Sequence, residues 1–310
     1  MQDQSSITLI GPLTLEVNLK AKRGPGMIGD SYLAKNRGLH FGGPLLKQIR
    51  CLMSLGHSAN LIAYTGNDEH SQKIIDTIKQ EGINANIQKL PGIATPISCN
   101  LFDGKSFSNF TSKIKDLSLW KLRLDATKIT SSVIMIDPSI PSEIQIAIIK
   151  KYHKNATIVV RRPLDNNLEV FNAAKNLVVV LNEHDAFQLF LLMDKHFFHG
   201  YTALKLPLLE NHQVVVESKK NLHILDEDNK ALFIDFENIK TQSDITNEYF
   251  MATFLSALAG KQQLKSAVIW GLVGAIQNEH NLPVASIEIM KSVNQFKWQK
   301  VKPDDEINVK

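Results

Sequence analysis

Short apolar segments alternate with amphipathic helical segments along most of this chain, and this alternation limits the folds it can adopt. Continuous apolar runs that predict strands cover residues 7–10, 60–64, 133–136, 157–160 and 177–181. Apolar side chains recur at helical spacing in residues 43–56, 68–81 and 142–151. Short strands that are apolar throughout and separated by helices form parallel sheets with both faces covered. The sequence therefore predicts an α/β protein, a three-layer α/β/α sandwich with a mostly parallel central sheet.

Two polar regions, 18–41 and 87–110, interrupt this pattern and read as excursions from the sheet. We expect them to form a small β lid inserted into a single domain that spans residues 1–310. Short turns join three later apolar runs, which predict an antiparallel edge of the sheet at 213–216, 222–225 and 231–235. Helices are expected at 248–258, 264–277 and 286–293.

The composition excludes some classes of function. The formal net charge is +4, and the 35 Lys and Arg residues are interspersed with the 31 Asp and Glu residues. A nucleic-acid-binding protein would gather its positive charge on one surface, so we expect no nucleic-acid partner. The two cysteines lie far apart without metal-ligand spacing, which favours reduced thiols. No signal-peptide pattern and no apolar run of membrane-spanning length occur, so we expect a cytoplasmic protein with no membrane partner.

Six short motifs follow one another along the chain. They are Gly11-Pro-Leu-Thr-Leu-Glu16, Pro25-Gly26, Gly42-Gly43, Thr65-Gly-Asn-Asp68 with Glu81-Gly82, Asn182-Glu-His-Asp185, and Ile245-Thr-Asn-Glu248. In this order they resemble the motifs of the ribokinase, or PfkB, family of carbohydrate kinases. The resemblance implies a ribokinase-like fold, ATP and Mg²⁺ as cofactors, and phosphoryl transfer to a hydroxyl of a sugar or related small molecule. It also implies a homodimer that assembles through the lid.

The resemblance implies a role for each motif. Glu248 stands at the position of the catalytic aspartate. The anion hole and the phosphate site would be formed by Ile245, Thr246, Asn247, Asn182 and Asp185. The substrate pocket would be formed by Glu16, Gly42, Gly43 and Lys47, and a sugar or sugar phosphate would bind there. No metal ligand is assigned with these motifs.

Several positions depart from the family pattern. Glu248 carries one methylene more than aspartate, and a displacement of about 1 Å can cost about 10²-fold in rate. Ile245 and Thr246 replace glycines, and β-branched residues crowd a phosphate site and resist positive φ. Residues 206–211, where a glycine-rich nucleotide loop is expected, contain no glycine. Two functions therefore stay open, a weak kinase with Glu248 as base and an inactive pseudokinase that binds ligands or assembles.

Some residues have competing interpretations. As a first-turn acid, Glu248 would only stabilise a helix capped by Asp244 or Thr246, and this interpretation is favoured. We also expect Asp68 to cap its own helix.

A second pair of alternatives concerns the basic residues. We hypothesise that Glu16 and Lys47 form an ion pair that fills the sugar site. Alternatively, Lys47 binds an anionic substrate together with Arg161 and Arg162, although a solvated strand end is favoured for that arginine pair.

Overall fold

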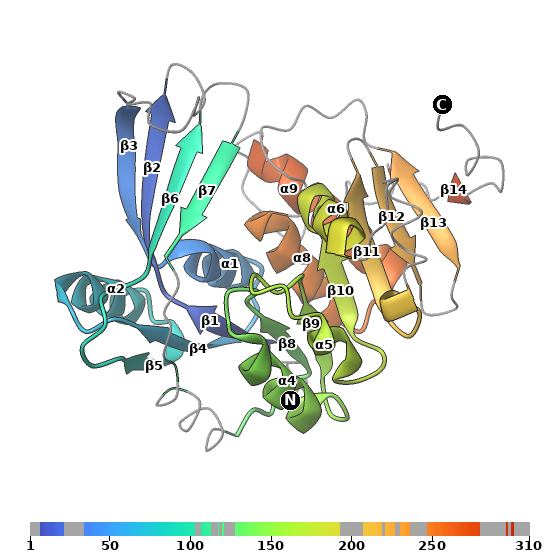
Figure 1. The fold of residues 1–310 in the computed structure, drawn as a ribbon, viewed down its shortest axis with the longest axis horizontal. Helices are drawn as coiled ribbons and strands as arrows, with labels where there is room; N and C mark the ends of the chain where they lie inside the picture. The colour runs from blue at the N-terminus through green and yellow to red at the C-terminus, as the bar shows by residue number, and fades with distance from the viewer. Residues whose placement is uncertain are drawn as a thin grey trace.

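The computed structural model describes residues 7–21, 34–102, 107–112, 117, 120, 128–192, 207–218, 221–226, 230–235, 247–279, 296 and 299–300 (Figure 1). Its larger sheet has the strand order β14-β13-β12-β11-β10-β9-β8-β1-β4-β5. The strands are β1 (Ile7–Pro12), β4 (Ala59–Thr65), β5 (Asn84–Lys89), β8 (Val133–Ile136), β9 (Thr157–Val160), β10 (Val178–Leu181), β11 (Gln213–Ser218), β12 (Asn221–Leu225), β13 (Ala231–Asp235) and β14 (Gln299–Lys300). From β11 to β5 all neighbours are parallel, which confirms the predicted parallel sheet.

Helices cover both faces of this sheet. They are α1 (Gly43–Ser54), α2 (Glu69–Gln80), α4 (Ser142–Tyr152), α5 (Glu169–Asn172), α6 (Glu183–Leu192), α8 (Glu248–Ala259) and α9 (Leu264–Glu279). Val178 and Val180 of β10 pack into the core cluster that contains the apolar residues of α1, α2, α8 and α9. Val179 and Leu181 pack into the opposite cluster with α4, α5 and α6. This alternation buries every side chain of the strand, and it confirms the three-layer sandwich.

The predicted antiparallel edge is also present. Strand β12 pairs antiparallel with β11, and β13 pairs antiparallel with β12. The expected helix at 286–293 and the Pro25-Gly26 motif lie outside the described residues.

A second sheet has the order β3-β2-β6-β7 and stands apart from the larger one (Figure 1). Its strands are β2 (Leu15–Ala21), β3 (Ala34–Phe41), β6 (Ile97–Phe102) and β7 (Phe107–Thr111). We call it the lid sheet. It differs from the predicted excursions at two boundaries. Strand β2 begins at Leu15, so Glu16 belongs to the lid sheet, and Ile87 pairs with Ala63 in the larger sheet.

A turn of two glycines connects the lid sheet to α1. The φ angles of Gly42 and Gly43 are 105° and 65°, a region that favours glycine. A Cβ at Gly43 would lie 2.0 Å from Thr14 Oγ1, and the Gly42 N–H donates to the Thr14 carbonyl at 2.8 Å. The glycine pair thus holds the start of α1 against the link between β1 and β2, which fixes Lys47 beneath the lid sheet.

Candidate functional site

The carboxyl ends of the parallel strands meet at one edge of the larger sheet, and the lid sheet begins at the same edge. Polar residues follow three neighbouring strands there: Asp137 follows β8, Arg161 and Arg162 follow β9, and Asn182 follows β10. Ligands of open α/β sheets bind outside the carboxyl ends of the strands. This edge is therefore the candidate site, and it contains two clusters of charged side chains.

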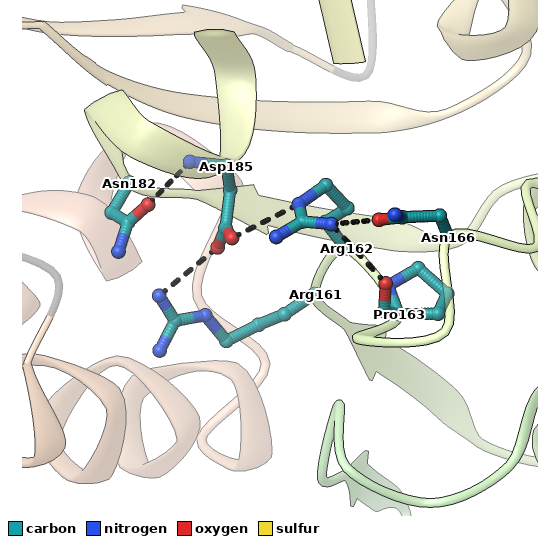
Figure 2. Close-up of polar contacts among 6 residues, drawn as sticks. All are labelled: Arg161, Arg162, Pro163, Asn166, Asn182 and Asp185. Atoms are coloured by element: carbon teal, nitrogen blue, oxygen red, sulfur yellow. Dashed lines mark hydrogen bonds and ion pairs between the residues drawn. The ribbon is translucent and has the colours of Figure 1, made fainter. Parts of the chain in front are cut away.

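The first cluster, here called the strand-end cluster, consists of Arg161, Arg162, Asn182, Asp185 and Asn166. Figure 2 shows both guanidinium groups directed at the Asp185 carboxylate. Arg161 Nη2 lies 3.3 Å from Asp185 Oδ2, and Arg162 Nε lies 3.2 Å from Oδ1. Asn182 Oδ1 accepts the Asp185 backbone N–H at 2.7 Å and so holds the start of α6. The structure therefore joins the predicted pair Asn182 and Asp185 to both arginines.

The two arginines of this cluster differ in their surroundings. The Arg162 side chain is 8% exposed, and its Nη1 also donates to the Pro163 carbonyl and to Asn166 Oδ1. The Arg161 side chain is 21% exposed and makes one hydrogen bond within the described residues, to Asp185. The prediction of a solvated strand end is wrong, because the Asp185 carboxylate, on the first turn of α6, accepts from both guanidinium groups.

Asp137 lies next to the strand-end cluster and was not singled out from the sequence. Its Oδ1 accepts the Ser139 backbone N–H at 2.9 Å and the Ser139 hydroxyl at 2.5 Å. Burial raises the pKa of Asp137, although the Ser139 hydrogen bonds and the charge of Arg161 act in the opposite direction. Its position directly after a buried apolar strand is the signal that could have identified it.

The second cluster, here called the lid-side cluster, consists of Glu16, Asn100, Lys47 and Glu248. Lys47 Nζ lies 2.8 Å from Glu16 Oε1, so the hypothesised ion pair is confirmed. Asn100 Nδ2 donates to the same Oε1 at 2.8 Å. The Glu16 side chain is 3% exposed, and its Oε2 has no hydrogen-bond partner within the described residues. Two strands of the lid sheet and α1 therefore meet at one carboxylate.

Glu248 completes the lid-side cluster as the first residue of α8. Burial alone would lower the pKa of Lys47, but the charges of Glu248 and Glu16 and the hydrogen bond to Glu16 raise it above its usual value. The structure thus brings Glu248 close to the predicted pocket residues Glu16 and Lys47. Glu248 is half-buried at the helix start.

The N-terminus of α8 is capped by a residue that the sequence did not single out as a cap. Asn247 Oδ1 accepts the backbone N–H groups of Tyr249 at 3.0 Å and Phe250 at 3.1 Å. The predicted caps, Asp244 and Thr246, are wrong. Free N–H groups at a helix start are what binds a phosphate. Two of these donors are already bonded, so this helix end fits a nucleotide phosphate poorly. Ile245 and Thr246 lie outside the described residues.

The remaining predicted nucleotide features also fit ATP and Mg²⁺ poorly. Both Asp185 oxygens accept from guanidinium groups, so the carboxylate would have to exchange these for a metal or its water. Within the described part of the chain, no group of three His, Cys, Asp or Glu side chains could hold a metal ion. Of the segment predicted to carry the nucleotide loop, Leu206 lies outside the described residues, and residues 207–209 form one 3-10 turn with Leu209 buried.

Asp68 is a structural residue, as predicted. It caps α2, where its Oδ1 accepts the Ser71 N–H at 2.9 Å. Its Oδ2 accepts the Thr95 N–H at 2.7 Å, just before lid strand β6. Burial would raise the pKa of Asp68, but the hydrogen bonds from Thr95 and Ser71 lower it to about 2. These bonds tie the start of α2 to the base of the lid sheet.

Comparisons with known proteins agree with this architecture. No protein-family model matches the sequence, and no curated protein matches it. Ribokinase from Thermotoga maritima is similar in structure, with a TM-score of 0.71, 18% identity, and coverage of 93% of this chain and 99% of that one. The nucleoside kinase of Methanocaldococcus jannaschii gives 0.68 and 18%, with coverage of 94% and 98%. Phosphofructokinase-2 from Escherichia coli, in its tetrameric inhibited form, gives 0.70 and 13%, with coverage of 94% and 98%.

The chain therefore has the fold of the ribokinase and PfkB-type carbohydrate kinases over nearly its whole length. The resemblance implied by the six motifs is confirmed at the level of the fold. Among the described helices, none is both long and apolar enough to cross a bilayer.

Proposed function

We propose that this chain is a pseudokinase of the ribokinase-like fold, a binding or assembly protein in which phosphoryl transfer is weak or lost. The observation that carries this proposal is the 2.8 Å ion pair between Lys47 and Glu16, two residues that the sequence predicts to line the substrate pocket. A sugar hydroxyl would have to displace Lys47 or Asn100 from Glu16 Oε1 in order to bind there. An internal ion pair at short distance competes effectively with an uncharged hydroxyl.

The groups that phosphoryl transfer needs are also bonded internally. Such a reaction relies on positioning and on donors aimed at the charge of the transferred phosphoryl group. Asn247 takes up two amide donors of α8, and two arginines take up the Asp185 carboxylate. Functional groups in three separate parts of the site are thus bonded internally, which supports a loss of catalysis more than a single changed residue would.

A divergent kinase is the second candidate, and one observation favours it. The pKa of Lys47 is raised, after the opposing effect of burial, chiefly by the charge of Glu248. Glu248 therefore stands close to the predicted substrate pocket, as a base for a substrate hydroxyl must. In this case ATP with Mg²⁺ would be the cofactor and Glu248 the catalytic residue.

Turnover separates the two candidates. Purified protein is incubated with ATP and Mg²⁺ and a panel of sugars and sugar phosphates, and ADP release is measured. We expect no acceptor-dependent release above the background hydrolysis of ATP. Robust phosphorylation of any acceptor would overturn the pseudokinase proposal. If that activity disappears in Glu248→Gln, the divergent kinase replaces it.

The small-molecule ligand that we propose is a sugar or a sugar phosphate. One solved structure of the same fold, that of Escherichia coli phosphofructokinase-2, is a complex with fructose-6-phosphate. A thermal-shift screen over sugars and sugar phosphates tests this proposal, because a ligand that binds the folded state raises its melting temperature.

We also propose a homodimer through the lid sheet. Leu39 of β3 and Ile97 of β6 are 52% and 43% exposed, and they pair in register with Val17 and Leu15 of β2. Since residues paired across strands share a face, these apolar residues lie together on the face opposite Glu16. Sedimentation of the wild type and Leu39→Asp tests this: a dimer that becomes monomeric in the variant supports the proposal, and a wild-type monomer contradicts it.

A further inference from the structure

We propose that Arg161 binds a phosphate-type oxyanion of a small molecule at the strand-end cluster, and that it does so without a divalent cation. The inference goes beyond the proposed function, since it requires neither turnover nor an open pocket beneath the lid sheet. Guanidinium groups match the geometry of phosphate oxygens with paired N–H donors. The ligand class is therefore a phosphorylated small molecule, recognised through its phosphate group.

The charges at the strand-end cluster are unequal. Two guanidinium groups share the single carboxylate of Asp185. Among the described residues, Asp137 is an acid that also interacts with Arg161; burial raises its pKa and so disfavours its negative charge. One positive charge is therefore left without a full partner at an edge of the sheet where ligands bind.

Most N–H donors of Arg161 also make no hydrogen bond to a described residue. A guanidinium group has five N–H donors. Arg161 uses one described hydrogen bond, and at 3.3 Å this bond is longer than the roughly 2.7–2.9 Å of a strong charge-assisted contact. Its Nε atom is buried and has no acceptor among the described residues. A buried N–H without an acceptor costs free energy. An oxyanion that accepts a hydrogen bond from this donor would therefore be stabilised.

The rest of the cluster holds Arg161 in place. Arg162 is fixed by the Pro163 carbonyl and by Asn166, and it holds Asp185 from one side. Asn182 holds the backbone of Asp185 from the other side. Figure 2 shows the extended Arg161 side chain reaching Asp185 from a different side than Arg162. Arg162 is thus a positioning residue, and Arg161 is the residue that contacts the ligand.

The same arrangement disfavours a metal ion. A divalent cation beside Asp185 would lie next to two guanidinium groups. To bind the Asp185 carboxylate, it would have to displace both of them. The arginines supply the positive charge that a metal would bring to a phosphate group. Binding should therefore persist when divalent cations are removed.

Isothermal titration with inorganic pyrophosphate in the presence of EDTA tests this inference. We expect saturable binding by the wild type and an association constant at least about tenfold lower for Arg161→Gln, since the variant loses charge-assisted hydrogen bonds to the oxyanion. Arg161→Lys keeps the positive charge but lacks the paired N–H donors of a guanidinium group, so its affinity for pyrophosphate should be intermediate. Arg50→Gln is the matched control, because it removes a guanidinium from the exposed pair with Glu81. Its affinity should equal that of the wild type.

The variant Asp185→Asn should change the affinity for pyrophosphate in the opposite direction. Loss of the competing carboxylate should raise the affinity for pyrophosphate several-fold, whereas a purely structural role of the cluster would lower it. The inference is overturned if the wild type does not bind in EDTA, if Arg161→Gln binds as the wild type does, or if Asp185→Asn binds more weakly. The turnover assay of the proposed function leaves these results unaffected, so the two can fail separately.

Discussion

The lid-side cluster and the strand-end cluster lie at the same edge of the sheet but differ in their ratio of cations to carboxylates. On the lid side, one cation, Lys47, serves two carboxylates, and its contact with Glu16 is short at 2.8 Å. At the strand ends, two cations serve Asp185, and their contacts are long at 3.3 and 3.2 Å. In the lid-side cluster Lys47 and Asn100 both donate to Glu16 Oε1, whereas the strand-end cluster retains an Arg161 donor without an acceptor among the described residues. The lid-side cluster thus has an excess of carboxylates, and the strand-end cluster has an excess of guanidinium groups.

The largest expected effect comes from breaking the lid-side cluster. Lys47→Met leaves the buried Glu16 carboxylate without its cation, and we expect a loss of about 2–3 kcal/mol in the free energy of unfolding. This is below the roughly 3–5 kcal/mol of a fully buried pair because water reaches part of Lys47. Urea denaturation measures it. The double variant Glu16→Gln/Lys47→Met should recover most of the loss.

The exposed pair Arg50–Glu81 is the control for this experiment, since both side chains face solvent. Arg50→Met should cost less than about 1 kcal/mol. Equal losses in Lys47→Met and Arg50→Met would contradict the view that the lid-side cluster contains a buried ion pair.

The next effect separates the two arginines of the strand-end cluster. Arg162→Gln removes a buried guanidinium with three acceptors, and we expect it to lower the free energy of unfolding by about 2 kcal/mol. Arg161→Gln should cost less than about 1 kcal/mol, because it breaks one long contact. Thermal and urea unfolding of both variants provide the measurement. A larger loss for Arg161 than for Arg162 would reverse the roles assigned to them.

Sequence and structure agree where local pattern decides the outcome. The valine-rich strand at β10 and the antiparallel runs of β12 and β13 were predictable, because β-branched residues favour strands and short turns join neighbours. The Glu16–Lys47 ion pair was also predictable, since the family resemblance placed both residues in one pocket. The pairing of Arg161 with Asp185 was not. It depends on β9 and β10 being neighbours in the sheet, which no local pattern of charges reveals.

The prediction of the N-cap of α8 was wrong for a different reason. Asp244, Thr246 and Asn247 are all good N-cap residues within four positions, and helix ends are uncertain by one or two residues. The N-cap is Asn247, so Glu248 is the first residue of the helix and an acid in its first turn, as predicted. The motif is retained as a helix start, while the amide donors that it would supply are used by its own cap.

A moderate effect with a defined pH dependence is expected at Asp68, which joins α2 to the base of the lid sheet. Asp68→Asn should cost about 1 kcal/mol near neutral pH, because a charged cap and its bonds to Thr95 are weakened. Since the folded pKa is lowered from 3.8 to about 2, the stability from this charge is complete above pH 4 and is lost as the pH falls toward 2.

Urea unfolding at pH 6, 4 and 3 checks this sign. The difference between wild type and Asp68→Asn should be largest at pH 6 and shrink at pH 3. Asp76→Asn, on the exposed face of α2, should show no such trend. A difference that grows with acidity would show that the Asp68 charge is unfavourable in the folded protein.

The smallest effect concerns the amide donors at the start of α8. Asn247→Gly removes the capping oxygen at a cost of only a few tenths of a kcal/mol, whereas Asn247→Ala should cost about 1 kcal/mol. In an Arg161→Gln background, Asn247→Gly should restore weak pyrophosphate binding, because the N–H groups of Tyr249 and Phe250 become available to an anion. Asn247→Ser retains a cap and should not restore it. If serine and glycine behave alike in the titration, the cap is not what closes this helix end, and the nearby carboxylate of Glu248 becomes the remaining barrier to an anion.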